Sequence, residues 1–409
     1  MTNRPGPLRA LLLENIHATA ADALTTAGFE VERVDRALEG DELLKRLDGV
    51  HLLGIRSGTT VRAEVFAQAP ALRAVGAFCI GTNQIDLMTA TAHGVAVFNA
   101  PFSNTRSVVE LAIAEIISLT RRMTVHNENM HAGVWKKSAT GSHELRGRSL
   151  GIIGYGNIGS QLSVLAEALG MRVFFYDTAD KLALGNAQRC STLDELLGAS
   201  DVVSLHVDGR PGNSGLFGED LFARMRPGSI FLNLSRGFVV DQAALRQHID
   251  SGHISGAALD VFPEEPAATG DPFASDLRGL KNVILTPHIA GSTEEAQEDI
   301  GRFVAGKLIA YVQAGTTALS VNLPSVQMPL RPESTRLLVL HRNQPGAMAR
   351  IDGLLAQHGL NIEQQVLSTT GGVGFAVTDV SGPVRAELIE ELRQMSDTIR
   401  VEALLPATG

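Results

Sequence analysis

The sequence has little cysteine and no long uninterrupted apolar segment. Cys79 and Cys190 are its two cysteines among 409 residues, and their separation fits no metal-binding pattern. We interpret both as free thiols in a reducing compartment. No segment approaches the ~20 apolar residues of a membrane-spanning helix, and Glu14 interrupts the first apolar run before it reaches the length of a signal-peptide core. We therefore expect a cytoplasmic protein with no membrane partner and no metal.

The sequence also has no excess of basic over acidic residues. The formal net charge of −9 disfavours nucleic acid or an anionic membrane as the main partner, because both would repel the average surface. Hydrophobic residues make up 44% and charged residues 19%, which is typical of globular proteins with a large core. The 409 residues correspond to two or three domains, at about 150 residues per domain.

The first hundred residues alternate short apolar runs with amphipathic stretches. This alternation predicts a parallel sheet with crossover helices. The expected strands cover residues 8–13, 52–55, 72–75 and 95–97, with a helix at 41–47. After Pro101 the pattern predicts a long, mostly apolar helix over 108–123, of the kind that is buried between two larger bodies.

A second α/β series starts at Ser149 and has the six strands that a doubly wound dinucleotide fold requires. The expected strands cover 150–153, 172–176, 202–206, 229–234, 256–261 and 283–286. A helix over 292–313 then returns the chain toward the first domain, and 323–332 reads as a proline-rich linker. The last eighty residues predict a βαββαβ order, which is a ferredoxin-like module.

A glycine pattern with the spacing G-x-G-x-x-G occupies Gly154, Gly156 and Gly159. An apolar strand precedes it and an amphipathic helix follows, which is the context that dinucleotide binding requires. The helix start offers free amides to a pyrophosphate. Asp177 lies at the end of the next strand, where a carboxylate binds the ribose hydroxyls of NAD and repels the extra phosphate of NADP.

Three polar residues lie just beyond predicted strands, where side chains face the ligand crevice of an α/β sheet. Arg236 offers a planar cation for a carboxylate. His288 titrates near neutral pH and can exchange a proton, and Glu265 beside it would raise the histidine pKa. Each of these residues, taken alone, is more often a solvated or structural side chain.

Together with their neighbours they resemble a family. Segments 151–159, 233–237, 260–266 and 286–292 resemble the successive motifs of the D-isomer-specific 2-hydroxyacid dehydrogenases. The resemblance implies that Arg236 anchors the substrate, Glu265 supports His288, and His288 is the acid/base. It also implies contacts to NAD at Gly154, Gly156, Asn157, Ile158, Gly159, Asp177, Leu234, Ser235, Arg236, Asp260, His288 and Gly291.

The flanking loops resemble those of family members that oxidise D-3-phosphoglycerate. Segments 54–57, 78–83 and 101–107 carry this likeness, and it implies substrate contacts at Arg56, Ser57 and Asn104. The last module, with 341–346 and 361–362, resembles an ACT domain of the serine-binding kind. That resemblance implies an allosteric L-serine site at His341, Asn343 and Asn361.

The resemblance implies three domains. Residues 1–103 and 291–331 would form a flavodoxin-like substrate domain, 104–290 an inserted Rossmann NAD domain, and 333–409 the ACT domain. The implied enzyme is a homotetramer that catalyses the first step of L-serine biosynthesis, forms 3-phosphohydroxypyruvate and is inhibited by L-serine. It would also reduce 2-oxoglutarate to 2-hydroxyglutarate.

Two positions depart from the family pattern. Asp208 replaces a proline near the adenosine site, and Thr335 stands where relatives have the first of two arginines that reach a neighbouring active site. Residues 135–137 and Arg336 are the remaining candidates for that phosphate contact.

Two other functions remain as alternatives to phosphoglycerate oxidation. The chain could be another 2-hydroxyacid dehydrogenase, such as a hydroxypyruvate or glyoxylate reductase, or a catalytically silent NAD-sensing regulator.

Overall fold

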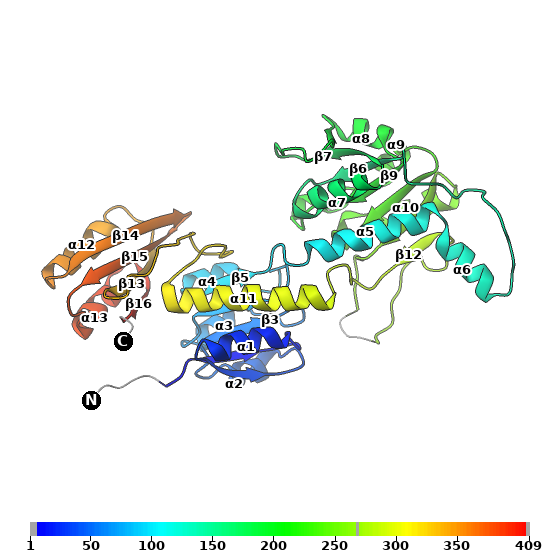
Figure 1. Cartoon of the computed structure of the whole chain (residues 1–409). Helices are drawn as coiled ribbons and strands as arrows, with labels where there is room; N and C mark the ends of the chain where they lie inside the picture. The colour runs from blue at the N-terminus through cyan, green and yellow to red at the C-terminus, as the bar shows by residue number, and fades with distance from the viewer. Residues whose placement is uncertain (1–5, 267–269, 406–409) are drawn as a thin grey trace. The chain divides into compact units, whose positions relative to one another are not determined.

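The computed structural model describes residues 6–266 and 270–405. The chain divides into two compact units: one is Asn104–Ala296, and the other joins Met1–Ser103 to Gln297–Gly409. The discontinuous unit holds two sheets and the continuous unit holds one (Figure 1). Within the described residues, no helix combines the length and the apolar character needed to cross a membrane.

A parallel five-stranded sheet forms the amino-terminal part of the discontinuous unit. Its strand order, β2-β1-β3-β4-β5, is the flavodoxin-like order and confirms that expectation. Neighbouring residues such as Leu52 and Leu53 enter different cores on the two faces, so the strands read as continuous apolar runs. The elements are β1 (Arg9–Leu12), α1 (Ala18–Thr26), β2 (Glu30–Arg33), α2 (Gly40–Arg46), β3 (Leu52–Ile55), α3 (Ala63–Gln68), β4 (Ala74–Ala77), α4 (Leu87–Ala92) and β5 (Ala96–Asn99).

The carboxyl-terminal module is an antiparallel four-stranded sheet in the order β14-β15-β13-β16, which confirms the ferredoxin-like prediction. One face of β13, including Leu337, packs with the two helices of the module. The other face, including Leu338, shares a core with Tyr311 of α11 (Glu294–Ala314). The elements are β13 (Thr335–Arg342), α12 (Ala347–Gln357), β14 (Asn361–Thr370), β15 (Val373–Ser381), α13 (Ala386–Gln394) and β16 (Thr398–Leu404).

The position of Arg336 contradicts its expected role in phosphate binding. Its side chain is 1% exposed and pairs with Asp379 through Nε at 2.6 Å and Nη2 at 2.8 Å. The remaining donors reach the carbonyls of Ala314, Met328 and Pro329. Because the guanidinium is fully used inside this unit, the expectation that Arg336 contacts a neighbouring phosphate is wrong. Its role is to attach the module to the preceding linker.

The continuous unit contains a parallel seven-stranded sheet in the order β12-β11-β10-β9-β6-β7-β8. This is a doubly wound Rossmann order extended by one strand, and its switch point lies between β6 and β9. The strands are β6 (Ser149–Ile153), β7 (Arg172–Tyr176), β8 (Gln188–Arg189), β9 (Val202–Leu205), β10 (Ser229–Asn233), β11 (Ile254–Leu259) and β12 (Val283–Leu285). The helices are α5 (Thr105–Thr120), α6 (Met123–His131), α7 (Asn157–Ala168), α8 (Leu193–Ala199), α9 (Glu219–Arg224) and α10 (Gln242–Asp250), with short 3-10 turns at Pro211–Asn213 and Gly237–Val239.

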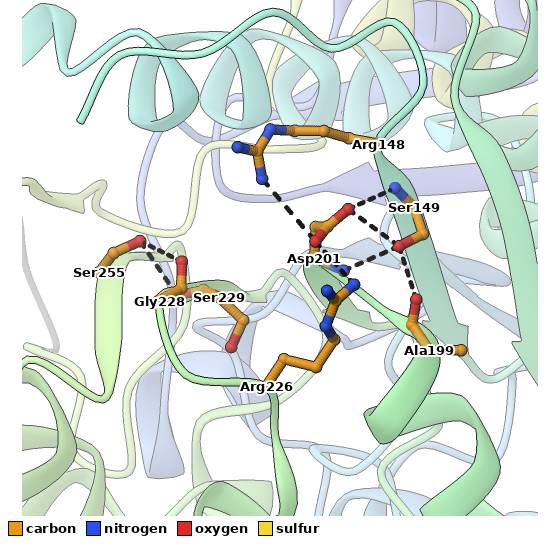
Figure 2. A network of polar contacts seen from close by, with 8 residues as sticks. All are labelled: Arg148, Ser149, Ala199, Asp201, Arg226, Gly228, Ser229 and Ser255. Carbon is orange, nitrogen blue, oxygen red and sulfur yellow. Dashed lines mark hydrogen bonds and ion pairs between the residues drawn. The ribbon is translucent and has the colours of Figure 1, made fainter. Parts of the chain in front are cut away.

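A polar network joins the amino ends of the central strands of this sheet (Figure 2). Asp201 accepts hydrogen bonds from the backbone and hydroxyl of Ser149 at 2.9 and 3.0 Å, and it pairs with Arg226 at 2.9 Å. Ser255 donates to the carbonyl of Gly228 at 2.8 Å. Since ligands of such sheets bind at the opposite, carboxyl edge, we interpret this network as scaffold.

The long helix predicted over 108–123 is two helices. Helix α5 packs against α7, but it ends at Thr120, and Arg122 has a φ of +51° before α6 begins at Met123 (Figure 1). The predicted single helix is therefore wrong at its carboxyl end. No residue of α6 is buried, so no apolar packing against the described parts of the chain favours its continuation in line with α5.

Candidate functional site

The glycine turn between β6 and α7 has the geometry of an open phosphate cradle. Gly154 has a φ of +92°, and a Cβ there would lie 2.5 Å from the carbonyl oxygen of His206. A Cβ at Gly159 would overlap the carbonyl of Gly154, so this glycine permits close packing of helix and strand. Gly156 faces open space: apart from its two chain neighbours, no heavy atom of the described residues lies within 4 Å of the position that a Cβ would take. The turn thus leaves room for a pyrophosphate above the start of α7, beside Asn157 and Ile158.

Asp177 lies beside this turn, at the end of β7. Its two carboxylate oxygens accept hydrogen bonds from the backbone amides of Tyr155 and Ala179, each at 2.8 Å. Each oxygen keeps a further lone pair for a hydroxyl donor. The carboxylate is therefore held at the place where a ribose would lie if a dinucleotide occupied the cradle.

A histidine–glutamate pair lies at the carboxyl edge of the same sheet. Nδ1 of His288 is 2.8 Å from Oε2 of Glu265, and Oε1 of Glu265 accepts the amide of Phe262 at 3.0 Å. An ionised carboxylate only accepts, so Nδ1 carries the hydrogen. Nε2 makes no hydrogen bond to the described residues and is available to a ligand.

The two side chains shift each other's proton affinity. The hydrogen bond that His288 donates to Glu265 raises the pKa of His288 against the opposing effect of burial. Burial would raise the pKa of Glu265, but the hydrogen bonds from His288 and Phe262 lower it overall. The pair therefore favours a charged carboxylate beside a histidine whose affinity for a proton is increased.

Asp260 anchors the loop that carries the histidine. It is 1% exposed and accepts Thr286 Oγ1 at 2.6 Å and the amides of Ile289 and Ala290 at 2.9 and 2.8 Å. These bonds hold His288 in a left-handed conformation, with a φ of +54°. Burial raises the pKa of Asp260 in spite of these hydrogen bonds.

Arg236 follows β10 and lies close enough for its charge to act on both members of the pair, so that it helps to lower the pKa of Glu265 and offsets a small part of the increase in the pKa of His288. Its Nη1 donates to the carbonyl of Ser235 at 2.7 Å. Asn233 organises the turn, because its amide group binds Ser235 and the carbonyl of Arg236. Leu234 and Ser235 are buried beneath the turn. Arg236, Glu265 and His288 are thus brought together as the sequence predicts.

Asn104 and Gly291 meet in the same unit. A Cβ at Gly291 would overlap the side-chain amide of Asn104, so a larger residue at this position would displace that side chain. Oδ1 of Asn104 is buried and has no hydrogen-bond partner among the described residues. Arg56 and Ser57 belong to the other unit, in the loop that follows β3, with Arg56 half-buried and Ser57 exposed.

The residues expected to bind an amino acid lie in two places on the carboxyl-terminal module. His341 is 2% exposed, and its Nε2 has no partner among the described residues. Asn343 is nearby, because its backbone and side chain donate to the hairpin at Gly372 and Gly371. Asn361 starts β14, which is ten residues long, at the end away from that hairpin. A strand of that length spans about 30 Å, so Asn361 and His341 of one chain are far apart.

Two buried or half-buried acids escaped the sequence analysis. Glu115 of α5 is 2% exposed, and neither of its carboxylate oxygens has a partner among the described residues. Its signal in the sequence is an acid on an otherwise apolar helix face. Glu14 accepts three backbone amides of the loop that holds Arg56. The described residues contain no group of three or more His, Cys, Asp or Glu arranged to hold a metal.

Comparisons with known families match two parts of the chain. Residues 113–290 match the model of the D-isomer specific 2-hydroxyacid dehydrogenase NAD binding domain. Residues 337–400 match that of the AHAS small subunit-like ACT domain.

Curated relatives and solved structures extend the likeness. A D-3-phosphoglycerate dehydrogenase of Haemophilus influenzae is 48% identical over 99% of this chain and 100% of its own length. The protein of that name from Escherichia coli strain K12 is 46% identical over 97% of both chains. A D-lactate dehydrogenase from Aquifex aeolicus, solved with NAD and lactic acid, is 27% identical with a TM-score of 0.64, over 74% of this chain and 95% of its own.

Proposed function

The chain belongs to the D-isomer-specific 2-hydroxyacid dehydrogenases, and from this premise we propose that it oxidises D-3-phosphoglycerate to 3-phosphohydroxypyruvate with NAD. The identity of 48% over nearly the whole chain to a relative of that activity supports the substrate. The observation that carries the chemistry is the 2.8 Å contact between His288 and Glu265 beside Arg236.

The proposed mechanism assigns one task to each side chain. Arg236 binds the substrate carboxylate, and Nε2 of His288 removes the proton of the C2 hydroxyl. Glu265 stabilises the imidazolium that results, because it already holds the Nδ1 hydrogen. Bound NAD supplies the acceptor for the hydride that leaves C2. In the reverse direction the protonated His288 returns its proton to the carbonyl oxygen.

The cofactor residues fit NAD. The space above Gly156 suits a pyrophosphate, and Asp177 suits the two ribose hydroxyls and disfavours a 2′-phosphate. We propose contacts from Asn157, Ile158, Leu234, Ser235, Asp260 and Gly291 as well. For the substrate we propose contacts from Arg56, Ser57 and Asn104. We propose that residues 1–103 and 291–331 form the substrate domain, residues 104–290 the NAD-binding domain, and residues 333–409 the regulatory domain.

The regulatory ligand that we propose is L-serine, bound to His341, Asn343 and Asn361. Because Asn361 and His341 lie at opposite ends of the module, a single serine would contact all three only if a second copy supplies Asn361. Strand β14 is an edge of its sheet, so two modules can pair there. Inhibition then requires that serine bind a less active arrangement more tightly.

We also propose a homo-oligomer, as a tetramer, working in the cytoplasm. Helix α6 has no buried residue, and the chain after it exposes Val134 and 81% of Trp135. Apolar groups exposed together mark protein interfaces. Light scattering of the wild type and a Trp135→Glu variant tests this, and an unchanged mass would remove Trp135 from the interface.

The test of the activity is NAD-linked turnover with a panel of D-2-hydroxyacids and 2-oxoacids. We expect the highest kcat/KM with D-3-phosphoglycerate, and measurable reduction of 2-oxoglutarate. Preference for hydroxypyruvate or glyoxylate would replace the substrate assignment. His288→Gln should lower kcat by about 10²–10⁴-fold while NADH binds normally, whereas absence of turnover in the wild type with intact NADH binding would favour a silent sensor.

A further inference from the structure

One carboxylate organises the loop that follows β3. Oε1 of Glu14 accepts the amides of Arg56 at 3.0 Å and Thr59 at 2.9 Å, and Oε2 accepts the amide of Gly58 at 2.7 Å. Hydrogen bonds to an ionised carboxylate are stronger than neutral ones. A single side chain therefore fixes three of four consecutive backbone positions.

The backbone of Glu14 is itself unusual. Glu14 and Asn15 have φ values of +59° and +51°, in the left-handed region that non-glycine residues seldom adopt. The amide of Glu14 donates to the carbonyl of Arg36 at 3.2 Å, which helps to hold this turn. The turn directs the carboxylate into the amides of the loop rather than into solvent.

The backbone of Arg56 is consequently held at its amide and at its carbonyl. Glu14 binds its amide, and Nε2 of Gln84 donates to its carbonyl at 2.7 Å. Its guanidinium makes no hydrogen bond or ion pair with the residues that the structure describes. A fixed backbone with an uncommitted cation is what a binding site for an anionic ligand requires, because less freedom is lost on binding.

We propose that Glu14 is a positioning residue for substrate recognition, acting through Arg56. The inference rests on the proposed function, since it assigns a support to the loop that binds the substrate. Successive backbone amides that converge in this way bind anions. Glu14 fills that position with an internal anion, so a phosphate or carboxylate of the substrate is directed to the side chains of Arg56 and Ser57 instead.

The experiment compares Glu14→Gln with a control, Glu30→Gln, at an exposed position on β2. Glutamine keeps the size but loses the charge and places an amide donor against amide donors. We expect KM for D-3-phosphoglycerate to rise at least tenfold in Glu14→Gln, with KM for NAD and the melting temperature changed little. The control should match the wild type in all three. An unchanged substrate KM in folded Glu14→Gln would overturn the inference.

A double-mutant cycle separates positioning from general support. If Glu14 acts through Arg56, adding Glu14→Gln to Arg56→Ala should cost less than twofold more in kcat/KM, and additive losses would overturn the proposal. If Glu14→Gln does not fold, Gln84→Glu is used instead, because it removes the hydrogen bond to the carbonyl of Arg56. The same rise in the substrate KM is then expected, and an unchanged KM would count against the proposal. If the wild type prefers another 2-hydroxyacid, the substrate assignment fails and the same comparisons are made with that acid.

Discussion

Glu115 should make the folded state less stable as the pH rises. Its carboxyl is buried without a partner among the described residues, and burial, with a smaller effect of the Asp260 carboxylate, raises its pKa to about 8. The neighbouring strands β10, β11 and β12 contain no ionisable side chain, and Glu167 of α7 is bound to Asn186. Glu115 is therefore protonated at neutral pH in the folded chain only.

The magnitude follows from proton linkage. In the unfolded chain a glutamate loses its proton near its ordinary pKa of 4.5, whereas folded Glu115 keeps it up to about 8. Between these values the folded state binds one more proton, so its stability falls by about 1.4 kcal/mol per pH unit. From pH 5.5 to 7.5 the loss is about 2.7 kcal/mol, which corresponds to roughly 5–10 °C in melting temperature for a unit of this size.

The assay is unfolding of the wild type and Glu115→Gln at pH 5.5, 6.5 and 7.5. Glutamine cannot titrate, so the variant should gain about 2.7 kcal/mol relative to the wild type across this range. Glu110→Gln, at an exposed position on the same helix, is the control and should follow the wild type. If the stability of Glu115→Gln and of the wild type change in parallel with pH, Glu115 does not titrate as we argue.

Three other changes test the remaining contacts. Arg336→Met should lower the free energy of unfolding by about 3–5 kcal/mol in denaturant titrations, because it leaves a buried carboxylate unpaired; a loss under 1 kcal/mol would contradict this. Glu265→Gln should shift the alkaline limb of kcat/KM for reduction to lower pH, since it removes the group that raises the pKa of His288; an unmoved limb would exclude that cause. Gly156→Ala should weaken NADH binding without lowering the melting temperature, whereas Gly154→Ala should lower both, and titration with calorimetry distinguishes them.

The parts of the site that depend on local pattern could be predicted from the sequence. Gly154 and Gly156 follow a buried strand, and Asp177 ends the next one, so their spacing alone indicates a dinucleotide turn. Arg236 and His288 follow buried strands of the same sheet, and the carboxyl ends of parallel strands lie along one edge. Local hydrophobic periodicity was therefore enough to group residues that are fifty positions apart.

Exposed elements left a weaker signal. Strand β2 (Glu30–Arg33) is the edge of the sheet that the described residues form and pairs there with β1. Three of its four residues are charged, so no apolar run marks it in the sequence. The two residues that follow α5 are Arg121 and Arg122, so neither glycine nor proline marks the break in the sequence. The break is decided by packing, since α5 faces the core and α6 buries nothing.

Long-range polar contacts were beyond the sequence altogether. Asp379 lies 43 positions after Arg336, and Glu14 lies 42 positions before Arg56. No spacing rule relates such pairs, and the burial that turns an arginine into an internal clamp, or an acid into a support for a loop, exists only after folding. The sequence by itself determined the sheets, the glycine turn and the strand-end chemistry, because these depend on neighbours within a few residues. The tertiary structure decided which charges are buried, paired or free, because that depends on which distant surfaces meet.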